Sequence, residues 1–241
     1  MKRLAGTVWL CLCIAAPVIA ASVIAAPVNA AAPHNTLSDD ERAGGWQLLF
    51  DGQTLDGWRS YGHSQPQPAW QVHDATIALT SPGGGDLITH RTYADFELRM
   101  EWRISEAGNS GVFILADECD YPIFVHAPEI QVLDDARHPD NKLATHRSGS
   151  LYDLIAAPAM SQRPAGSWNT LRIRHQKGHL TVWQNQIPVA DIHLDGEAWR
   201  KLVRGSKFAD WQGFGSFRDG HIGLQDHGDP VAFRNIKLLE L

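Results

Sequence analysis

Apolar and polar residues alternate in short runs along most of this chain, and turn residues separate the runs. In the clearest run, residues 96–104, five apolar positions are separated by four charged ones. Successive side chains of a β-strand point to opposite faces of a sheet, so such a run predicts a strand with one buried face. Similar runs predict strands at 46–50, 69–72, 76–79, 111–115, 129–133, 171–174, 180–183, 222–224 and 232–241.

Helical periodicity is rare by comparison. Only two segments, Gly196–Gly205 and Ser38–Arg42, have the composition of a short amphipathic helix and of a capped turn. A hairpin is expected around Lys177-Gly178, with a second turn at Asn185-Gln186. Many short strands with closely spaced turns predict an all-β fold, in which two antiparallel sheets form a β-sandwich or jelly roll.

Two of the predicted strands carry unusual side chains on their polar faces. In one, Glu129 and Gln131 alternate with apolar residues, and in the other, Gln225 and His227 follow Ile222-Gly223-Leu224. If the apolar sides share a core, a carboxylate, two amides and an imidazole lie on one polar face. Solvent-facing strands usually carry Lys, Thr or Glu there, so this set indicates a site for sugar binding or proton transfer.

The N-terminus has the organisation of a bacterial export signal. Lys2 and Arg3 form a basic start, an apolar run extends over residues 4–28, and Val28-Asn29-Ala30 offers a small-residue cleavage site. A retained membrane anchor is the alternative, because the run is long enough to span a bilayer. Prolines and alanines in the run favour cleavage. We therefore expect a signal peptide at 1–30, a flexible lead at 31–44, one domain at 45–241, and a periplasmic or secreted protein without stable membrane insertion.

Cleavage would change the charge and the cysteine content of the chain. Without Lys2 and Arg3 the basic count falls from 21 to 19 against 27 acidic residues, a net charge of about −8 with histidine neutral. An acidic chain of this kind lacks the basic patch that a nucleic acid or an anionic membrane requires. Cys119 would be the one remaining cysteine, so no intrachain disulfide and no thiolate zinc site is expected.

Three glutamates, Glu97, Glu101 and Glu129, occupy the polar sides of predicted strands. Two facing carboxylates can hydrolyse a glycosidic bond, one as the acid and the other as the base or nucleophile. For Glu97, a salt bridge with neighbouring arginines is the favoured interpretation. For Glu129, which lies beside an amide on the same face, a functional role is favoured.

Glycine-containing motifs point to turns and close approaches. Gly83-Gly84-Gly85 lacks the Lys-Ser/Thr of a phosphate-binding loop and predicts a turn. Asn109-Ser110-Gly111 opens a strand, where its glycine leaves space for a ligand or a neighbouring backbone. A hairpin turn explains this second motif equally well.

A divalent-cation site is a further candidate. The segment after the Glu129 strand contains oxygen and nitrogen ligands suited to such an ion, but a solvated loop is the favoured interpretation. The residues concerned are Asp134, Asp135, His138, Asp140 and His146.

Short motifs occur in a specific order from about Gly45 to Leu241. They are Leu49-Phe50-Asp51-Gly52, Leu55-Asp56-Gly57-Trp58, Asp95-Phe96-Glu97-Leu98, Glu101-Trp102-Arg103, Asn109-Ser110-Gly111-Val112-Phe113, residues 128–134, His138-Pro139-Asp140, residues 148–153, Trp168-Asn169-Thr170, Ser206-Lys207-Phe208, residues 220–228 and Phe233-Arg234-Asn235-Ile236. Each motif alone is weak. Together and in this order they resemble the 3-keto-disaccharide hydrolase family.

The resemblance implies a concanavalin-like jelly roll that acts on small glycosides oxidised at carbon 3 of the sugar. A ketone there acidifies the hydrogen on carbon 2, so a base can remove it, the substituent on carbon 1 can leave, and water can add. Glu129 and His227 are the candidates for proton transfer, and Glu101 is a third. A metal ion bound by Glu129 and His227 is an alternative means of stabilising the enolate. The candidates for substrate binding are Asn109, Gln131, Gln225, Asp134, His138 and Tyr152.

Three classes of function remain open from the sequence. A 3-keto-glycoside enzyme would act only on oxidised sugars, whereas an ordinary two-carboxylate glycosidase would cleave unoxidised glycosides. A carbohydrate-binding module would bind sugars and cleave neither. The pairing of His227 with Glu129 favours an enzyme, because amides and aromatic platforms suffice for sugar binding.

Overall fold

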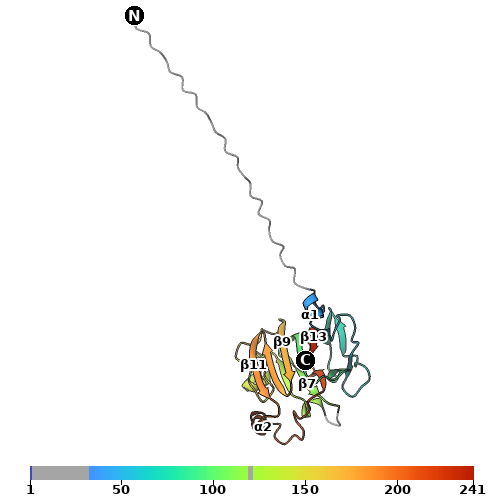
Figure 1. Cartoon of the computed structure of the whole chain (residues 1–241), viewed down its shortest axis with the longest axis vertical. Helices are drawn as coiled ribbons and strands as arrows, with labels where there is room; N and C mark the ends of the chain where they lie inside the picture. The colour runs from blue at the N-terminus through green and yellow to red at the C-terminus, as the bar shows by residue number, and fades with distance from the viewer. Residues whose placement is uncertain (2–32, 119–121) are drawn as a thin grey trace. The chain divides into compact units, whose positions relative to one another are not determined.

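Residues 33–118 and 122–241, together with Met1, are described by the computed structural model of this chain (Figure 1). The rest of the signal peptide expected at residues 1–30 lies outside the described residues, and so does Cys119. From residue 33 onward, the described residues belong to one compact unit. Among the described residues, no helix has the length and the apolar character needed to cross a membrane.

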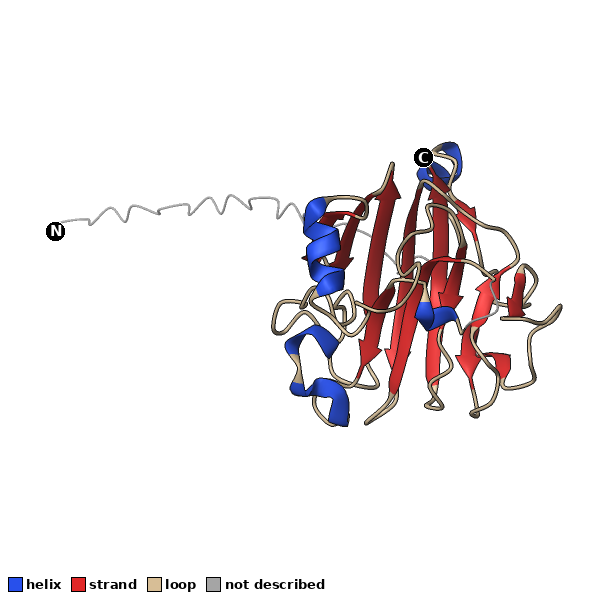
Figure 2. Cartoon of the chain, turned by 90° about the horizontal axis from the view of Figure 1, so that it is seen from below, coloured by secondary structure: helices blue, strands red, loops and turns tan. Residues whose placement is uncertain are grey.

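The strands of the described chain form two antiparallel sheets, which confirms the predicted all-β sandwich (Figure 2). The larger sheet contains β1 (Gln47–Leu48), β3 (Trp70–His73), β4 (Thr76–Leu79), β6 (Phe96–Ile104), β9 (Asn169–Gln176), β10 (His179–Gln184), β11 (Ile187–His193) and β13 (Val231–Glu240). The smaller sheet contains β2 (Trp58–Ser60), β5 (Leu87–Thr89), β7 (Asn109–Ala116), β8 (Glu129–Leu133) and β12 (His221–Leu224).

The order of strands places the two unusual polar segments on either side of one strand. In the larger sheet the order is β11-β10-β9-β6-β13-β4-β3, with β1 beside β13; in the smaller sheet it is β2-β5-β12-β7-β8. Gly111 of β7 is opposite Gln131 of β8, and Phe113 of β7 is opposite Gly223 of β12. Strands β8 and β12 therefore share β7 as their neighbour, which brings residues 129 and 225 to the same part of the sheet.

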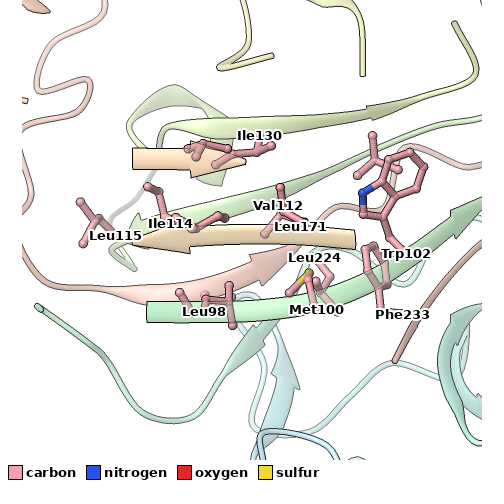
Figure 3. Packing of buried hydrophobic residues seen from close by; sticks show 14 of the residues in the cluster. Leu98, Met100, Trp102, Val112, Ile114, Leu115, Ile130, Leu171, Leu224 and Phe233 are labelled. Carbon is pink, nitrogen blue, oxygen red and sulfur yellow. The ribbon is translucent and has the colours of Figure 1, made fainter. Parts of the chain in front are cut away.

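The core lies between the sheets and is built from their facing apolar side chains (Figure 3). Leu98, Met100 and Trp102 project into it from β6, each at most 2% exposed, while Val112 enters from β7 and Ile130 from β8. Full burial of a side chain of this size stabilises the folded state by about 2 kcal/mol before the entropy cost. The alternation of apolar and charged residues in 96–104 thus corresponds to the buried and the outer face of β6.

Short helical pieces connect the strands. The helix predicted at 196–205 is confirmed as α2 (Glu197–Arg204), with a glycine at each end. The capped turn near residue 38 is α1 (Asp39–Ala43), whose Ser38 and Glu41 form a capping box. Three 3₁₀ turns, η1 (Ile123–Val125), η2 (Pro139–Lys142) and η3 (Ala144–His146), follow β7 and β8.

The segment predicted as a flexible lead, residues 31–44, makes specific contacts with the domain at Asn35. Asn35 is only 5% exposed, its backbone N–H donates to Oδ1 of Asn235 at 2.6 Å, and its own Oδ1 accepts from the Asn235 N–H at 2.8 Å. Its side-chain amide also donates to the Ala75 carbonyl. These paired amide contacts attach the segment to β13, and no hydrophobic pattern in the sequence signals them.

Candidate functional site

A pocket of about 560 Å³ lies over β7, β8 and the end of β12. This volume is within the range of about 300–1,000 Å³ that is usual for small-molecule sites. Seven of the nine site residues predicted from the sequence line it, namely Asn109, Glu129, Gln131, His138, Tyr152, Gln225 and His227. The pocket is thus the place where the two polar segments meet.

The floor of the pocket follows directly from strand alternation. Ile130 and Val132 are fully buried in the core, so Glu129 and Gln131 of the same strand must face the other way. After β12, Gln225 leaves the core face, and its backbone N–H donates to the Gly111 carbonyl at 2.9 Å. In both segments, the side chains that point into the core and those that point away from it are the ones expected from the sequence.

Gly111 creates the space in which the Glu129 side chain lies. A Cβ atom built on this glycine would be 2.7 Å from Cδ and 2.8 Å from Cγ of Glu129, which is closer than real Cβ contacts. The sequence suggested that this glycine makes room for a ligand or a backbone. The structure shows instead that the carboxylate of the adjacent strand occupies the room.

Glu129 is a buried carboxyl group with a shifted acidity. Its side chain and backbone together are 9% exposed, and burial raises the pKa of Glu129 to about 8. The positive charge of Lys207 and a hydrogen bond from Gln225 lower the pKa, whereas the charges of Asp86 and Asp140 raise it. A carboxyl group that titrates near neutral pH in a pocket is suited to both accepting and donating a proton.

Two amides beside Glu129 offer hydrogen-bond acceptors to a ligand. Oδ1 of Asn109 and Oε1 of Gln225 are buried and have no hydrogen-bond partner among the described residues. Buried acceptors are normally satisfied, and an unsatisfied one destabilises the fold by about 1–3 kcal/mol. Both residues line the pocket, so hydroxyl groups of a bound sugar are suitable donors for them.

The loop that carries His227 is fixed by its neighbour Asp226. One Asp226 carboxylate oxygen accepts from the backbone N–H groups of Gly83 and Gly84 at 3.0 and 2.6 Å. The triple glycine, for which the sequence predicts a turn, lies directly after a bend at residues 81–82 and holds the His227 loop through these two bonds. The Asp226 N–H donates to Asp86, a carboxyl whose pKa is raised to about 7 by burial and by the Asp226 charge.

One wall of the pocket is a chain of hydrogen bonds through His146. Its Nδ1 lies 2.8 Å from an Asp140 oxygen and its Nε2 lies 2.8 Å from an Asp153 oxygen. The Tyr152 hydroxyl donates to Asp140 at 3.1 Å, and burial together with the Asp140 charge raises the pKa of Tyr152, which keeps the phenol protonated. The backbone N–H of Lys207 donates to Asp153 at 2.8 Å, so the chain ties the Lys207 segment to this wall.

Lys207 is a charged residue of the pocket that reasoning from the sequence did not single out. Its ammonium nitrogen lies 4.2 Å from the centre of the Tyr152 ring, and it lines the same pocket as Glu129. Among the described lining residues it is the one lysine or arginine. The segment after α2 has no periodic pattern that would show which side chains face a pocket. In the sequence, Lys207 was noted only as part of the motif Ser206-Lys207-Phe208.

Two predicted site residues lie elsewhere. Glu101 is on β6 of the larger sheet, where it accepts hydrogen bonds from Arg234 at 2.7 Å and Asn235 at 2.9 Å. Asp134 is 2% exposed and accepts from the backbone N–H groups of Ala107 and Ala136, so it shapes a turn and does not form the pocket rim. Alternation identified the polar side of the Glu101 strand but could not show which surface that side faces.

The acidic residues of β6 and of the 134–146 segment have structural partners. Glu97 bonds to Arg99 and Arg172, so the predicted salt bridge is confirmed, with a cross-strand partner from β9. The residues considered for a divalent cation have hydrogen-bond partners within the protein: Asp135 accepts from the Ser148 N–H, His138 accepts from the Asp140 N–H, and Asp140 and His146 are bonded to each other. Among the described residues, no three His, Cys, Asp or Glu side chains converge as a metal ion would require.

Comparison with known proteins identifies the family. Residues 45–239 match the family described as the 3-keto-alpha-glucoside-1,2-lyase-like domain. This chain is also 38% identical to the 3-keto-disaccharide hydrolase of Bacteroides thetaiotaomicron, over 86% of this chain and 82% of that protein. The chain belongs to this family. The resemblance inferred from the order of the motifs is therefore confirmed.

Solved structures agree with this assignment at the level of the fold. A proposed glycosyl hydrolase from Parabacteroides distasonis has a TM-score of 0.81 and 27% sequence identity, covering 87% of this chain and all of that one. A protein from Bacillus subtilis with a galectin-like fold has a TM-score of 0.50 and 14% identity, covering 87% and 95%. These two solved structures thus share the two-sheet sandwich of this chain.

Proposed function

We propose that this protein cleaves the bond between carbon 1 and its substituent in small glycosides that are oxidised at carbon 3. Two names support this: the family is described as 3-keto-alpha-glucoside-1,2-lyase-like, and the relative from Bacteroides thetaiotaomicron is a 3-keto-disaccharide hydrolase. The observation that carries the proposal is the buried Glu129 carboxyl, with a pKa of about 8, in one pocket with Lys207 and His227.

The proposed reaction begins with removal of the hydrogen on carbon 2 by the Glu129 carboxylate. The electron pair of that C–H bond moves toward the ketone, and the ammonium group of Lys207 stabilises the resulting enolate oxygen. When the enolate collapses, a double bond forms between carbons 1 and 2, and the leaving oxygen takes a proton from His227. Water then adds to carbon 1, a proton returns to carbon 2, and the net result is hydrolysis.

The amides and the polar wall would position the sugar for this reaction. Asn109 and Gln225 have buried acceptors that no described residue satisfies, and Gln131 lies beside Glu129 on the same face. Hydrogen bonds to sugar hydroxyls at these points would hold carbon 2 next to the base. Such positioning raises the rate because the reacting groups must be close together and correctly oriented. His138, 6.4 Å from His227 between ring centres, completes the polar side.

The ketone requirement is the first test of this proposal. Purified protein is mixed with a 3-keto-disaccharide or with its unoxidised parent, and sugar release is followed. We expect turnover of the ketone alone, because an unactivated ring hydrogen is too weakly acidic for a carboxylate base. The reaction in deuterium oxide should also exchange the hydrogen on carbon 2. Equal rates on both sugars would contradict the proposal, and binding without turnover would indicate a carbohydrate-binding module.

The pH dependence of the reaction tests the role of Glu129. A base must be ionised, so the rising limb of the plot of kcat/KM against pH is expected to have its midpoint near pH 8, the pKa of Glu129. The charge of Lys207 favours the ionised form, so Lys207→Met should raise this pKa and move the rising limb to higher pH. Lys201→Met, on the exposed side of α2, is the matched control and should leave the profile unchanged. A profile without a rising limb near pH 8 would contradict the role of Glu129 as the base.

A second candidate function is direct hydrolysis by two carboxyl groups. Burial alone would raise the pKa of Asp140, but hydrogen bonds from His146 and Tyr152 lower it overall. Asp140 lines the same pocket as Glu129, and the two pKa values are moved in opposite directions, as in an acid and nucleophile pair. Both Asp140 oxygens already accept hydrogen bonds, however, which favours a supporting role.

A further inference from the structure

The side of the pocket next to Lys207 is aromatic. Four rings from three separate segments of the chain line it, namely Phe124, Tyr152, Phe208 and Trp211. In the proposed reaction the Lys207 ammonium group contacts the ketone oxygen, so these rings lie near carbon 3 of the sugar. The steps of that reaction give the rings no task, and strand alternation does not account for them, because two of them lie on the irregular segment after α2 and one on η1.

The ammonium nitrogen of Lys207 contacts three of these rings. Its Nζ lies 4.2 Å from the centre of the Tyr152 ring, 5.3 Å from that of Phe208 and 5.8 Å from that of Trp211. Each distance is within the range of about 6 Å over which the negative face of an aromatic ring attracts a cation. We call Tyr152, Phe208 and Trp211 the lysine cage.

The lysine cage holds the ammonium group without using its hydrogen-bond donors. Among the residues that the structure describes, none forms a hydrogen bond or a salt bridge with Nζ of Lys207. An ammonium group has three N–H donors. A salt bridge would use some of these donors and offset the positive charge, whereas a ring face leaves the donors available. Lys207 can therefore direct its N–H groups to a ketone oxygen.

The rings of the lysine cage are fixed by packing. Phe208 is only 3% exposed and stacks on Phe214 with 3.9 Å between ring centres. Trp211 packs edge-on against Phe208 at 5.1 Å, and Phe124 lies 6.0 Å from Trp211 on its other contact. These contacts hold the rings in place before a ligand binds.

Lys207 needs this restraint because it is an exposed residue with a long side chain. A free lysine side chain samples many rotamers, and ordering it costs conformational entropy. Its backbone is already held, since the Lys207 N–H donates to Asp153 at 2.8 Å, so the rings have only the side chain to order. A charge that is in place before the reaction stabilises a developing enolate without further reorganisation.

We propose that the lysine cage positions Lys207 for catalysis: Tyr152, Phe208 and Trp211 hold its ammonium group beside carbon 3, where the enolate oxygen forms. This inference rests on the proposed function, because that function gives Lys207 its role. The three aromatic residues act through Lys207 and are positioning residues. Tyr152, a candidate for substrate binding from the sequence, thus contributes the face of its ring to the lysine.

Fluorination of the ring at position 152 tests the cage with little change in shape. Tyr152→Phe is the reference, because it already lacks the hydroxyl group that bonds to Asp140. Phenylalanines with one, two or three ring fluorines are then placed at the same position, and each fluorine weakens the negative face of the ring. We expect kcat on a 3-keto-disaccharide to fall stepwise, by about fivefold for the trifluoro ring relative to Tyr152→Phe. KM should change much less, because the enolate charge develops only in the transition state.

The same series in a Lys207→Met background decides whether the effect passes through Lys207. No cation is then left for the ring to attract, so kcat should be equal for all members of the series. The matched control is the same series at Tyr93, whose ring lies 5.3 Å from the Arg91 guanidinium carbon and does not line the pocket. Fluorination there should leave kcat unchanged relative to Tyr93→Phe.

The outcomes separate this inference from the proposed function. A kcat that stays constant or rises along the series at position 152, while Lys207→Met alone is slow, would overturn the cage and leave the proposed function intact. An equal stepwise fall in the Lys207→Met background would also overturn the cage, because the ring would then act on the sugar or on the fold. A Lys207→Met variant with the wild-type kcat would remove Lys207 from the proposed reaction and this inference with it.

Discussion

Glu129→Gln is expected to lower kcat on a 3-keto-disaccharide by about a hundredfold or more, the usual scale for losing a general acid or base. Glutamine has nearly the same shape as glutamate, so it fits the space above Gly111, but its amide cannot take a proton from carbon 2. Initial rates of sugar release under saturating substrate measure the effect. Substrate binding, followed separately by titration, should change far less than kcat.

Glu101→Gln is the matched control, because it makes the same substitution at the other glutamate considered for catalysis. Glu101 lies on the larger sheet and is engaged with Arg234 and Asn235, so this variant should keep the wild-type kcat. An equal loss in both variants would mean that the effect is general destabilisation. A Glu129→Gln variant with full activity would remove Glu129 from the mechanism.

Gly111→Ala is expected to reduce kcat by about a hundredfold, although it adds only one methyl group. That methyl would be 2.7 Å from Cδ of Glu129, so the carboxylate must move from its place over β7. Displacement of a reacting group by about 1 Å can lower a rate by this factor. Rates are measured per folded molecule, with the folded fraction determined from tryptophan fluorescence.

Two further variants distinguish a displaced carboxylate from a damaged strand. Gly223→Ala places a methyl group 3.1 Å from Cβ of Phe113 in the neighbouring strand, where it meets apolar atoms. It should lower stability while the folded protein keeps its activity. The double variant Gly111→Ala/Glu129→Gln should be no slower than Glu129→Gln alone, because the carboxylate is already lost. Independent, multiplicative losses would show that Gly111 acts by another route.

Local patterns in the sequence were sufficient to predict most of the strands and the polar floor of the pocket, but they missed β2, β5 and β11. Alternation around Glu129 and before Gln225 identified which side chains leave the core, since strand geometry fixes that choice. Alternation does not encode which strands pair, so Glu101 was placed with Glu129 although the two lie on different sheets. Asp134 was misplaced for a similar reason, because a turn after β8 directs its carboxylate to backbone N–H groups.

The aromatic side of the pocket could not be predicted in the same way. Lys207 and Trp211 belong to a segment without regular periodicity, so their direction depends on contacts with distant residues such as Asp153 and Phe124. The role of Gly111 was also hidden, because a glycine in a strand says that space is needed but not what fills it. Long-range packing, which one sequence read alone does not reveal, decides these features.

The position of β12 between β5 and β7 determines when the site can form during folding. Strand β7 pairs on one side with β8, which follows it closely in the sequence. Its other edge pairs with β12, residues 221–224, which lie close to the end of the chain. Pairing between strands that are far apart in the sequence forms slowly, because the chain loses the entropy of a long loop before the new contacts can stabilise it. A chain truncated before residue 221 would keep Glu129 but lose Gln225 and His227, which line the same pocket. Recovery of enzymatic activity after dilution from denaturant should therefore report the docking of β12, a late step of folding.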